Sequence, residues 1–571
     1  VGSEMCIRDR CGLATADNGR FVRLWFEVAK NSIGFGCASA AASVASGRKF
    51  FPTIKGGGQR KWYGNQNEVI NWYNNGEEIK QYPGAVIRNE HCYFKPTVAW
   101  NMISSAGLSF RYFPKGFILN NASNGIPCEN INAMLGYLNT PYAGYVANIL
   151  NPTVNLSNGV VGNFPDMAPT STEFSYIVSD CVSISKQDWD AHETSWDFET
   201  SPLLAVDSQT YCDNIDWMIE CHRRKTGEQI CIDPAAPELG SLQWRYDQYC
   251  QKWECLFDRL HHNEEELNRK FIDIYGLQDE LTPDVALEDV TILQQGEIKI
   301  VDEAALELET GGVLTTESGE TLTVGIAPQI EWQKDVVIKQ FISYAVGCMM
   351  GRYRLDRPGL AIAHPNPSAD EYAPYVVPQT GEKWWIDDDG IVPMMGEDSP
   401  FHDNAANRFT EFVRVALGNE YLTENMNFVR DALGKDVVDY LRSDFYNDHK
   451  KMYQNRPIYW MFSSNQKGKR AAFQCLVYMH RMNRFTPEHI RTNYLLPYID
   501  HLAAREAELS ARSSLSAKEN KLLKQLRSDL EECRDYQLSL HEFADRQIEI
   551  DLDDGVIKNY ATFAPVLAKL K

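Results

Sequence analysis

The sequence contains no C-x-x-C pair among its 14 cysteines, and the closest spacing of interest is Cys250 to Cys255. A disulfide framework or a zinc ribbon would show more regular spacing, so we expect reduced thiols, a cytoplasmic protein and no metal. No run approaches 18 consecutive apolar residues, which argues against a membrane-spanning helix. The signatures G-x-x-x-x-G-K-[ST], H-E-x-x-H and G-x-S-x-G are missing, so nothing marks a P-loop, a zinc peptidase or a serine hydrolase.

One acidic run invites a metal interpretation. Asp387-Asp388-Asp389-Gly390 is similar to the beginning of a calcium-binding loop. It lacks the alternating ligands and the final Glu at the required spacing. We therefore interpret it as an acidic turn.

The beginning of the chain looks foreign. Methionine does not occupy position 1, and the first ten residues, VGSEMCIRDR, show no periodicity and resemble translated adapter sequence. We expect residues 1–10 to be such an artefact and the chain to be a fragment whose true start is lost.

Charge is distributed unevenly along the 571 residues, whose net charge is −22. The front (residues 1–165) holds 15 Lys and Arg against 9 Asp and Glu, a net charge of +6. The rear (residues 166–571) therefore carries −28. A basic, aromatic-rich front allows a nucleic-acid partner that the total charge alone would disfavour.

The length and the order of patterns predict a multidomain α+β protein, since one hydrophobic core rarely serves 571 residues. We expect a mixed α/β domain followed by a mainly helical C-terminal region with a helical hairpin. The expected segments are 11–170 (mixed α/β), 171–280 (connector and long helix), 281–332 (acidic, β-leaning insert), 333–500 (helical, aromatic-rich) and 501–571 (hairpin and tail).

Several local elements follow from periodicity and turn residues. We expect a helix after a cap at Asp17 or Asn18, one helix over 130–150, a long helix over 236–276, turns at Asn74-Asn75-Gly76 and Asn124-Gly125, and a hairpin turn at Ser513–Ser516.

Residues 60–115 carry the chemistry of a nucleic-acid interface. Cations neutralise phosphates, Arg and Asn can read base edges, and aromatic rings can stack on an unpaired base. An equally weighted alternative is that the aromatic residues are core and the cations extend past them to solvent. The candidates for phosphate or base contact are Arg60, Lys61, Arg88, Lys95, Arg111 and Lys115, and those for base or groove contact are Trp62, Tyr63, Asn65 and Tyr112.

Long motifs in this region resemble the target-recognition part of adenine-specific DNA methyltransferases, and in particular the PglX family of BREX phage-defence systems, which is related to type IIG restriction-modification enzymes. They are RKWYGNQNEVINWYNNGEEIK (60–80), YFKPTVAWNMISS (93–105), FRYFPKGFIL (110–119) and LGYLNTPYAGYVANILNPTVN (135–155). Further matches to the family continue downstream at SKQDWDAHETSWDF (185–198), NEEELNRKFIDIYGLQDELTP (263–283), FISYAVGCMMGRYRLD (341–356), FYNDHKKMYQNRPIYWMF (445–462) and EIDLDDGVIKNYATF (549–563). The resemblance covers nearly everything after residue 11.

The resemblance implies methyl transfer from S-adenosylmethionine to adenine N6, with an F-x-G-x-G type cofactor loop and an N-P-P-Y type catalytic loop. Asn151-Pro152-Thr153-Val154 and Asn366-Pro367-Ser368-Ala369 lack the second Pro and the aromatic residue, and Ser32–Gly36 lacks the spacing of the cofactor loop. The family places its methyltransferase domain before this region. We therefore expect no catalytic residue and no cofactor site in the chain, which would be inactive alone.

The resemblance implies that residues 11–170 are a DNA target-recognition domain. The acidic helical rear would close around double-stranded DNA or bind other defence-system proteins, and we expect no membrane partner. Two alternatives remain, a stand-alone DNA-binding specificity subunit and an interaction scaffold that does not bind DNA. A nuclease is a weaker one, because no P-D…(D/E)-x-K core is evident.

Overall fold

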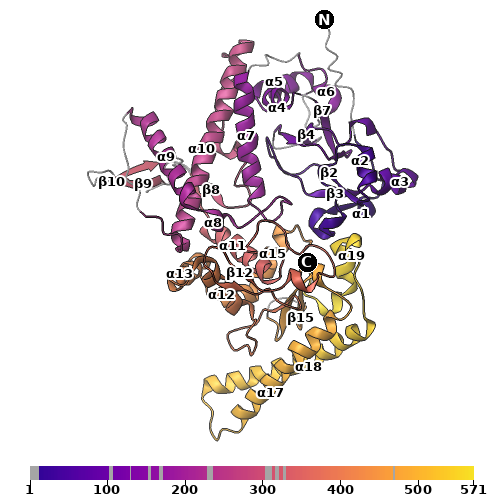
Figure 1. Ribbon diagram of the computed structural model, residues 1–571, viewed down its shortest axis with the longest axis vertical. Coiled ribbons are helices and arrows are strands. Elements are labelled where there is room, and N and C mark those ends of the chain that lie inside the picture. Colours follow the sequence, from indigo (N-terminus) through magenta and orange to yellow (C-terminus); the bar gives the residue numbers. More distant parts are fainter. Residues whose placement is uncertain are drawn as a thin grey trace.

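The computed structural model describes residues 12–101, 107–128, 130–151, 156–165, 172–227, 236–301, 311–315, 321–325, 330–466 and 470–570. It is an α+β protein with many helices and several small sheets, as the sequence predicts. Figure 1 shows the front beside two long upright helices, α7 (Thr172–Asp190) and α10 (Leu242–Tyr275). Helix α9 (Ser208–Thr226) lies on the other side of α10, and most of the later helices of the rear lie below.

The front contains two small sheets. The first has the order β1-β3-β2-β6 and is antiparallel except for its β2–β6 pair, and the second has the antiparallel order β5-β4-β7. The strands are β1 (Val22–Leu24), β2 (Phe50–Ile54), β3 (Glu68–Asn71), β4 (Thr97–Asn101), β5 (Phe110–Phe113), β6 (Ile118–Leu119) and β7 (Ser123–Pro127).

Short helices border these sheets. They are α1 (Asn18–Phe21), α2 (Ala40–Ala45), α3 (Tyr73–Gln81), α4 (Ile131–Leu138), α5 (Pro141–Leu150) and α6 (Asn158–Val161). Asp17 caps α1 as predicted, but the helix ends after four residues because the chain continues as β1, paired with β3. Asn74, Asn75 and Gly76 have positive φ angles, which confirms a turn there.

Two predictions for the front are wrong. Asn124-Gly125 is not a turn but lies within β7, where a Cβ on Gly125 would lie 2.8 Å from Thr97 Cγ2. The glycine is therefore required by close packing rather than by chain reversal. The single helix expected over 130–150 is two helices, α4 and α5, which separate at Asn139.

The long helices form the boundary between front and rear. α10 (Leu242–Tyr275) begins at the Ser241 cap and ends at Gly276, which confirms the predicted long helix. It packs against α7 (Thr172–Asp190), α8 (Pro202–Ala205) and α9 (Ser208–Thr226). Within residues 281–332, the described part contains the strands β8 (Ile298–Ile300), β9 (Gly311–Thr315), β10 (Thr321–Gly325) and β11 (Ile330–Trp332).

The rest of the rear is helical around one buried sheet. Its helices are α11 (Lys334–Met349), α12 (Ala405–Leu417), α13 (Leu422–Leu433), α14 (Val437–Ser443), α15 (Phe445–Met452) and α16 (Thr486–His489). The sheet, of order β14-β16-β15, consists of β14 (Ile391–Pro393), β15 (Tyr459–Ser463) and β16 (Gln474–Tyr478), beside the short pair β12 (Tyr375–Val376) and β13 (Lys383–Trp384). Sequence reasoning missed this sheet because its strands are buried on both faces and show no alternation.

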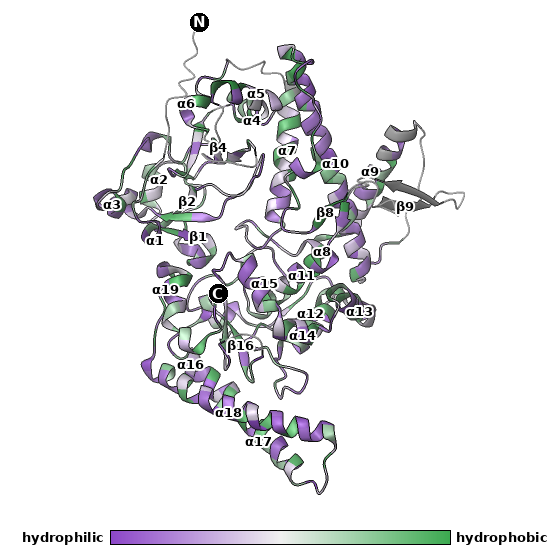
Figure 2. Ribbon diagram, turned by 180° about the vertical axis from the view of Figure 1, so that it is seen from behind, coloured by the Kyte–Doolittle hydropathy of each residue, from purple (hydrophilic) through white to green (hydrophobic). Residues whose placement is uncertain are grey.

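The predicted hairpin is present as α17 (Leu496–Ser510) and α18 (Ala517–Arg546). Both helices mix hydrophilic and hydrophobic residues, and they extend away from the rest of the molecule (Figure 2). The last helix, α19 (Gly555–Thr562), returns to the front. Among the helices that the structure describes, none combines the length and apolar character needed to cross a membrane.

Candidate nucleic-acid interface

Residues 60–63 extend the β5-β4-β7 sheet instead of forming a surface loop. The amide of Trp62 donates to Phe110 O at 2.9 Å, and the amide of Tyr112 donates to Trp62 O at 2.7 Å. Trp62 is consequently paired with Arg111 as a bridge, and both side chains are buried.

The Arg60 guanidinium is held inside the protein. Its Nη2 lies 2.5 Å from a carboxylate oxygen of Asp188, near the end of α7, and the two side chains are 6% and 1% exposed. Its Nε donates to Tyr63 O at 2.8 Å, and the guanidinium lies 5.1 Å from the ring of Trp189. Arg60 therefore joins the front to α7.

Lys61 and Trp62 make an equivalent contact with α10. Lys61 Nζ and Trp62 Nε1 lie 2.5 Å and 2.6 Å from the two carboxylate oxygens of Glu264. The amide of Lys61 donates to the hydroxyl of Thr291, which adds a third contact. One carboxylate thus binds two adjacent front residues, and we call residues 60–63 with Asp188 and Glu264 the clamp.

Tyr63 and Arg111 are also interior. Tyr63 is 3% exposed and its hydroxyl donates to Gln66, while burial raises its pKa. Arg111 is fully buried, and loss of solvation, with a smaller contribution from the nearby Arg60 charge, lowers its pKa to about 10.

The structure thus corrects part of the expected interface. Five candidates lie in the interior, and three of them are bound by carboxylates of the rear. These five are Arg60, Trp62, Tyr63 and Arg111, which are buried, and Lys61, whose side chain is 12% exposed. The aromatic residues Trp62 and Tyr63 are core, as the alternative expected, but Arg60 and Arg111 are buried with them instead of extending to solvent. A buried cation stays charged at a tolerable cost only where an acid or several acceptors face it, and such acceptors are present here.

The remaining candidates are accessible to different degrees. Arg88, Lys95 and Lys115 are exposed, and none makes an ion pair with a described residue. Asn65 and Tyr112 are half-buried, and Asn65 Nδ2 donates to Gly58 O at 2.8 Å. Among the predicted candidates, these three exposed cations are the groups most available to a phosphate.

Sequence reasoning missed Arg48, which is exposed and has no ion-pair partner among the described residues. It follows α2 in a small-residue stretch, and neighbouring aromatic residues were the signal used to select the other cations. Its neighbour Lys49 pairs with Asp553, in the segment before α19, so adjacent cations have different surroundings.

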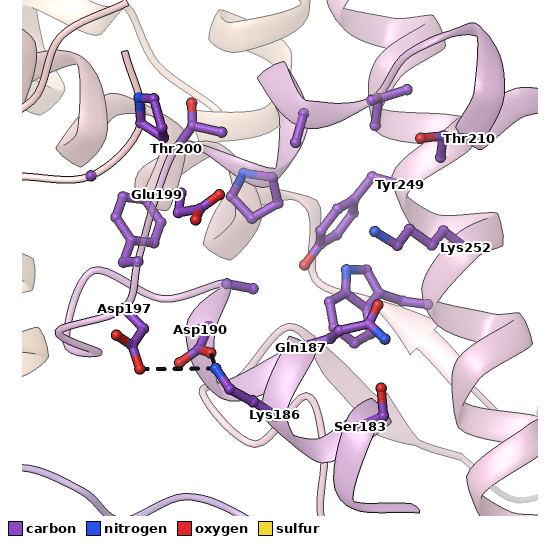
Figure 3. Close-up of a pocket in the computed structure, with 18 of the residues that line it drawn as sticks. Ser183, Lys186, Gln187, Asp190, Asp197, Glu199, Thr200, Thr210, Tyr249 and Lys252 are labelled. Carbon is purple, nitrogen blue, oxygen red and sulfur yellow. Dashed lines mark hydrogen bonds and ion pairs between the residues drawn. The ribbon is translucent and has the colours of Figure 1, made fainter. Parts of the chain in front are cut away.

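A cavity of about 700 Å³ opens where α7, α8, α9 and α10 meet near the 358–359 loop. Lys186 is bound by Asp190 and Asp197, and Lys252 stands across the cavity from them (Figure 3). With Glu199, the lining holds three carboxylates against two ammonium groups. That balance disfavours a phosphate in this cavity and leaves the front surface as the better candidate interface.

The glycine segment Ser32–Gly36 does not fit S-adenosylmethionine. A cofactor loop needs a free space over its glycines, but a Cβ on Gly34 would lie 2.3 Å from the ring of Phe51. Gly34 therefore packs against the sheet, and the hydrogen bond from its amide to Phe50 O also places it there. Of the two N-P segments, Pro152–Val154 lies outside the described residues.

In the other N-P segment, Ser368 caps a turn with Glu371, whose carboxylate also binds His364. The acidic run is a turn as interpreted, because Asp387 Oδ1 accepts from the amides of Gly390 and Ile391.

Comparison with known proteins finds two relatives along nearly the whole chain. One, from Escherichia coli O9:H4 (strain HS), is named adenine-specific methyltransferase BrxX and is 32% identical over 577 residues, which cover 96% of this chain and 42% of that protein. Another, from Lacticaseibacillus casei (strain Zhang), is named adenine-specific methyltransferase PglX. It is 33% identical over 582 residues, which cover 97% of this chain and 42% of that protein. No family model matches. The chain spans less than half the length of these relatives, and the resemblance expected from its motifs is confirmed.

Proposed function

We propose, from this resemblance to PglX-like adenine-specific methyltransferases of BREX systems, that the chain is the DNA-recognition and C-terminal scaffold part of a site-specific adenine-N6 DNA methyltransferase of phage defence. The observation that carries the proposal is the set of exposed cations on the front that have no ion-pair partner among the described residues, beside cations of the same region, residues 60–115, that the rear has neutralised. Double-stranded DNA would be bound by the front, and other defence proteins by the acidic rear.

The proposal assigns phosphate contact to Arg88, Lys95 and Lys115, with Arg48 as an addition. Asn65 and Tyr112 stay candidates for base or groove contact. The clamp would hold the front at a fixed position on α7 and α10, so that exposed cations keep one geometry toward the duplex. Catalysis and S-adenosylmethionine binding belong, in this proposal, to a domain outside these residues.

The test is duplex-DNA binding by residues 12–571, titrated across salt concentrations. Wild type should bind with a steep salt dependence. The triple variant Arg88→Ala/Lys95→Ala/Lys115→Ala should bind every duplex more weakly and lose about one unit of salt slope for each phosphate contact removed. A matched control is Lys518→Ala/Lys521→Ala/Lys524→Ala, which removes three exposed lysines from α18 in the rear.

Three outcomes separate the alternatives. Equal effects of the two triple variants would remove the front cations from the interface. No binding at low salt by a folded chain would favour the interaction scaffold. A calorimetric signal with S-adenosylmethionine, or methylation of adenine by this chain, would contradict the assignment of catalysis to another domain.

A further inference from the structure

The loop Gly56–Gly58 connects β2 to the clamp and is held from its inner side. Asn101 Nδ2 donates to Gly57 O at 2.6 Å, and Asn65 Nδ2 donates to Gly58 O at 2.8 Å. The amide of Gly56 donates to the hydroxyl of Ser123. Side chains from three parts of the front thus fix the loop and occupy its carbonyl groups.

The outer side of the loop has donors without acceptors. Gly57 and Gly58 are exposed, and neither of their amides, nor that of Gln59, donates to any described residue. Consecutive free backbone amides in a glycine loop form a concave set of donors that suits an anion.

Arg111 supplies a positive charge directly beneath this loop. Its Nη1 lies 3.3 Å from Gly58 O, and its Nη2 donates at 2.7 Å to Asn101 Oδ1, the same residue that holds Gly57. Its Nε has no hydrogen-bond partner, although the side chain is fully buried. Among the described residues no carboxylate pairs with it, in contrast to Arg60.

A buried guanidinium without a counter-charge is costly unless something else offsets it. Here the described residues provide only neutral acceptors, which are Gly58 O, Arg60 O and Asn101 Oδ1. The residual positive potential therefore extends to the exposed amides of the loop. An anion placed on those amides would be attracted by both the donors and the buried charge.

The glycine at position 57 is required by this geometry, whereas Gly58 is not. Gly57 has φ +136°, and a Cβ there would lie 2.4 Å from Asn65 Nδ2. A Cβ on Gly58 would meet nothing within 4 Å, so there is open space outside the loop. A ligand can therefore approach the amides of Gly58 and Gln59 directly.

We propose that the Gly56–Gly58 loop, supported from below by Arg111, is a phosphate-binding site that holds one phosphate of the nucleic-acid backbone. The assignment rests on the proposed DNA-binding function and gives it a fixed contact point on the front. Backbone phosphates are the anions that the neighbouring exposed cations would also attract. The contact would position the duplex without reading its sequence, since only backbone amides take part.

The experiment compares Gly58→Asp with the matched control Gly159→Asp in residues 12–571. Gly159 is exposed in α6, also in the front, so both variants add one negative charge to the same region. Gly58→Asp should weaken duplex-DNA binding roughly tenfold and lower the salt slope by about one unit, while Gly159→Asp should remain close to wild type. Gly58→Ala keeps the amide and has room for its methyl group, so it should bind as wild type does.

Two further arms keep the test decisive. Gln59→Glu places a negative charge beside the loop with little change of side-chain shape. This variant is used in place of Gly58→Asp if Gly58→Asp does not fold. Pyrophosphate, followed by broadening of its ³¹P signal, probes the anion site without DNA: wild type and Gly159→Asp should broaden it, and Gly58→Asp should not.

The outcomes distinguish the two proposals. DNA binding that Gly58→Asp and Gly159→Asp reduce equally would overturn the loop site and leave the proposed function standing. Loss of pyrophosphate binding only in Gly58→Asp, with no DNA binding by wild type, would support the anion site and overturn the proposed function. Absence of both kinds of binding in wild type would overturn both.

Discussion

At Arg60, a guanidinium of the kind that contacts phosphate is bound instead to Asp188 within the protein. A buried ion pair contributes little net stability, but removal of one partner leaves the other charge without compensation. Arg88, Lys95 and Lys115 have no such partner among the described residues, so their loss would leave no buried charge behind there. Cations of the same region, residues 60–115, therefore differ in what their substitution would do.

This difference predicts that substitution of two arginines changes the free energy of unfolding by very different amounts. Arg60→Ala should lower the free energy of unfolding by about 3–5 kcal/mol, because the buried Asp188 carboxylate loses its counter-charge. Arg88→Ala should change it by less than about 0.5 kcal/mol, since the side chain is exposed. Urea denaturation followed by tryptophan fluorescence measures both. Similar stabilities of the two variants would show that the clamp is not a structural contact.

At the scale of elements, helices with an apolar stripe were predictable and buried strands were not. The hairpin was predictable because Leu523, Leu526 and Leu530 recur at helical spacing, and all three are buried. The strands β15 and β16 lack a polar face that could reveal a period of two. The break between α4 and α5 was signalled by Pro141 at the first turn of α5, and the side chain of Asn139 fixes it by binding both backbone groups of Phe110.

Helix α18 provides its own matched pair for a stability test. Leu530 is 6% exposed against α17, whereas Leu538, on the same helix, is 66% exposed. Leu530→Ala should cost about 2–5 kcal/mol through lost burial and the cavity left behind. Leu538→Ala should cost less than about 0.5 kcal/mol. The midpoints of thermal unfolding of the two variants measure this difference in stability. Equal midpoints would mean that the hairpin does not pack as described.

At the scale of the whole molecule, the front contacts the rear on two sides. The clamp joins it to α7 and α10. On the other side, Lys49 and Arg23 bind Asp553. Three residues further along, the amide of Val556 donates to the carboxylate of Glu27. A polar cleft of about 780 Å³ lies along this second contact. Part of the charge asymmetry between front and rear is therefore neutralised inside the protein, and the exposed front cations remain.

The second contact predicts a charge-swap result. Lys49→Glu should speed hydrogen–deuterium exchange in residues 551–558, because like charges then face each other at Asp553. Combining it with Asp553→Lys should restore slow exchange. Arg48→Glu reverses an adjacent, unpaired charge and serves as the control. If the double variant exchanges as fast as Lys49→Glu, the ion pair does not hold α19 against the front.

The sequence by itself determined the family resemblance, the α+β class, the long helix, the hairpin and the uneven distribution of charge, because motifs, periodicity and composition are local properties of the chain. Only the tertiary structure decided which cations of residues 60–115 remain free. Arg60 and Asp188 are 128 residues apart, and Lys61 and Glu264 are 203 apart, so no local pattern could reveal those pairs. Whether a charged side chain faces water or a distant carboxylate depends on how the chain folds back on itself, and that placement separates the structural cations from those that face solvent.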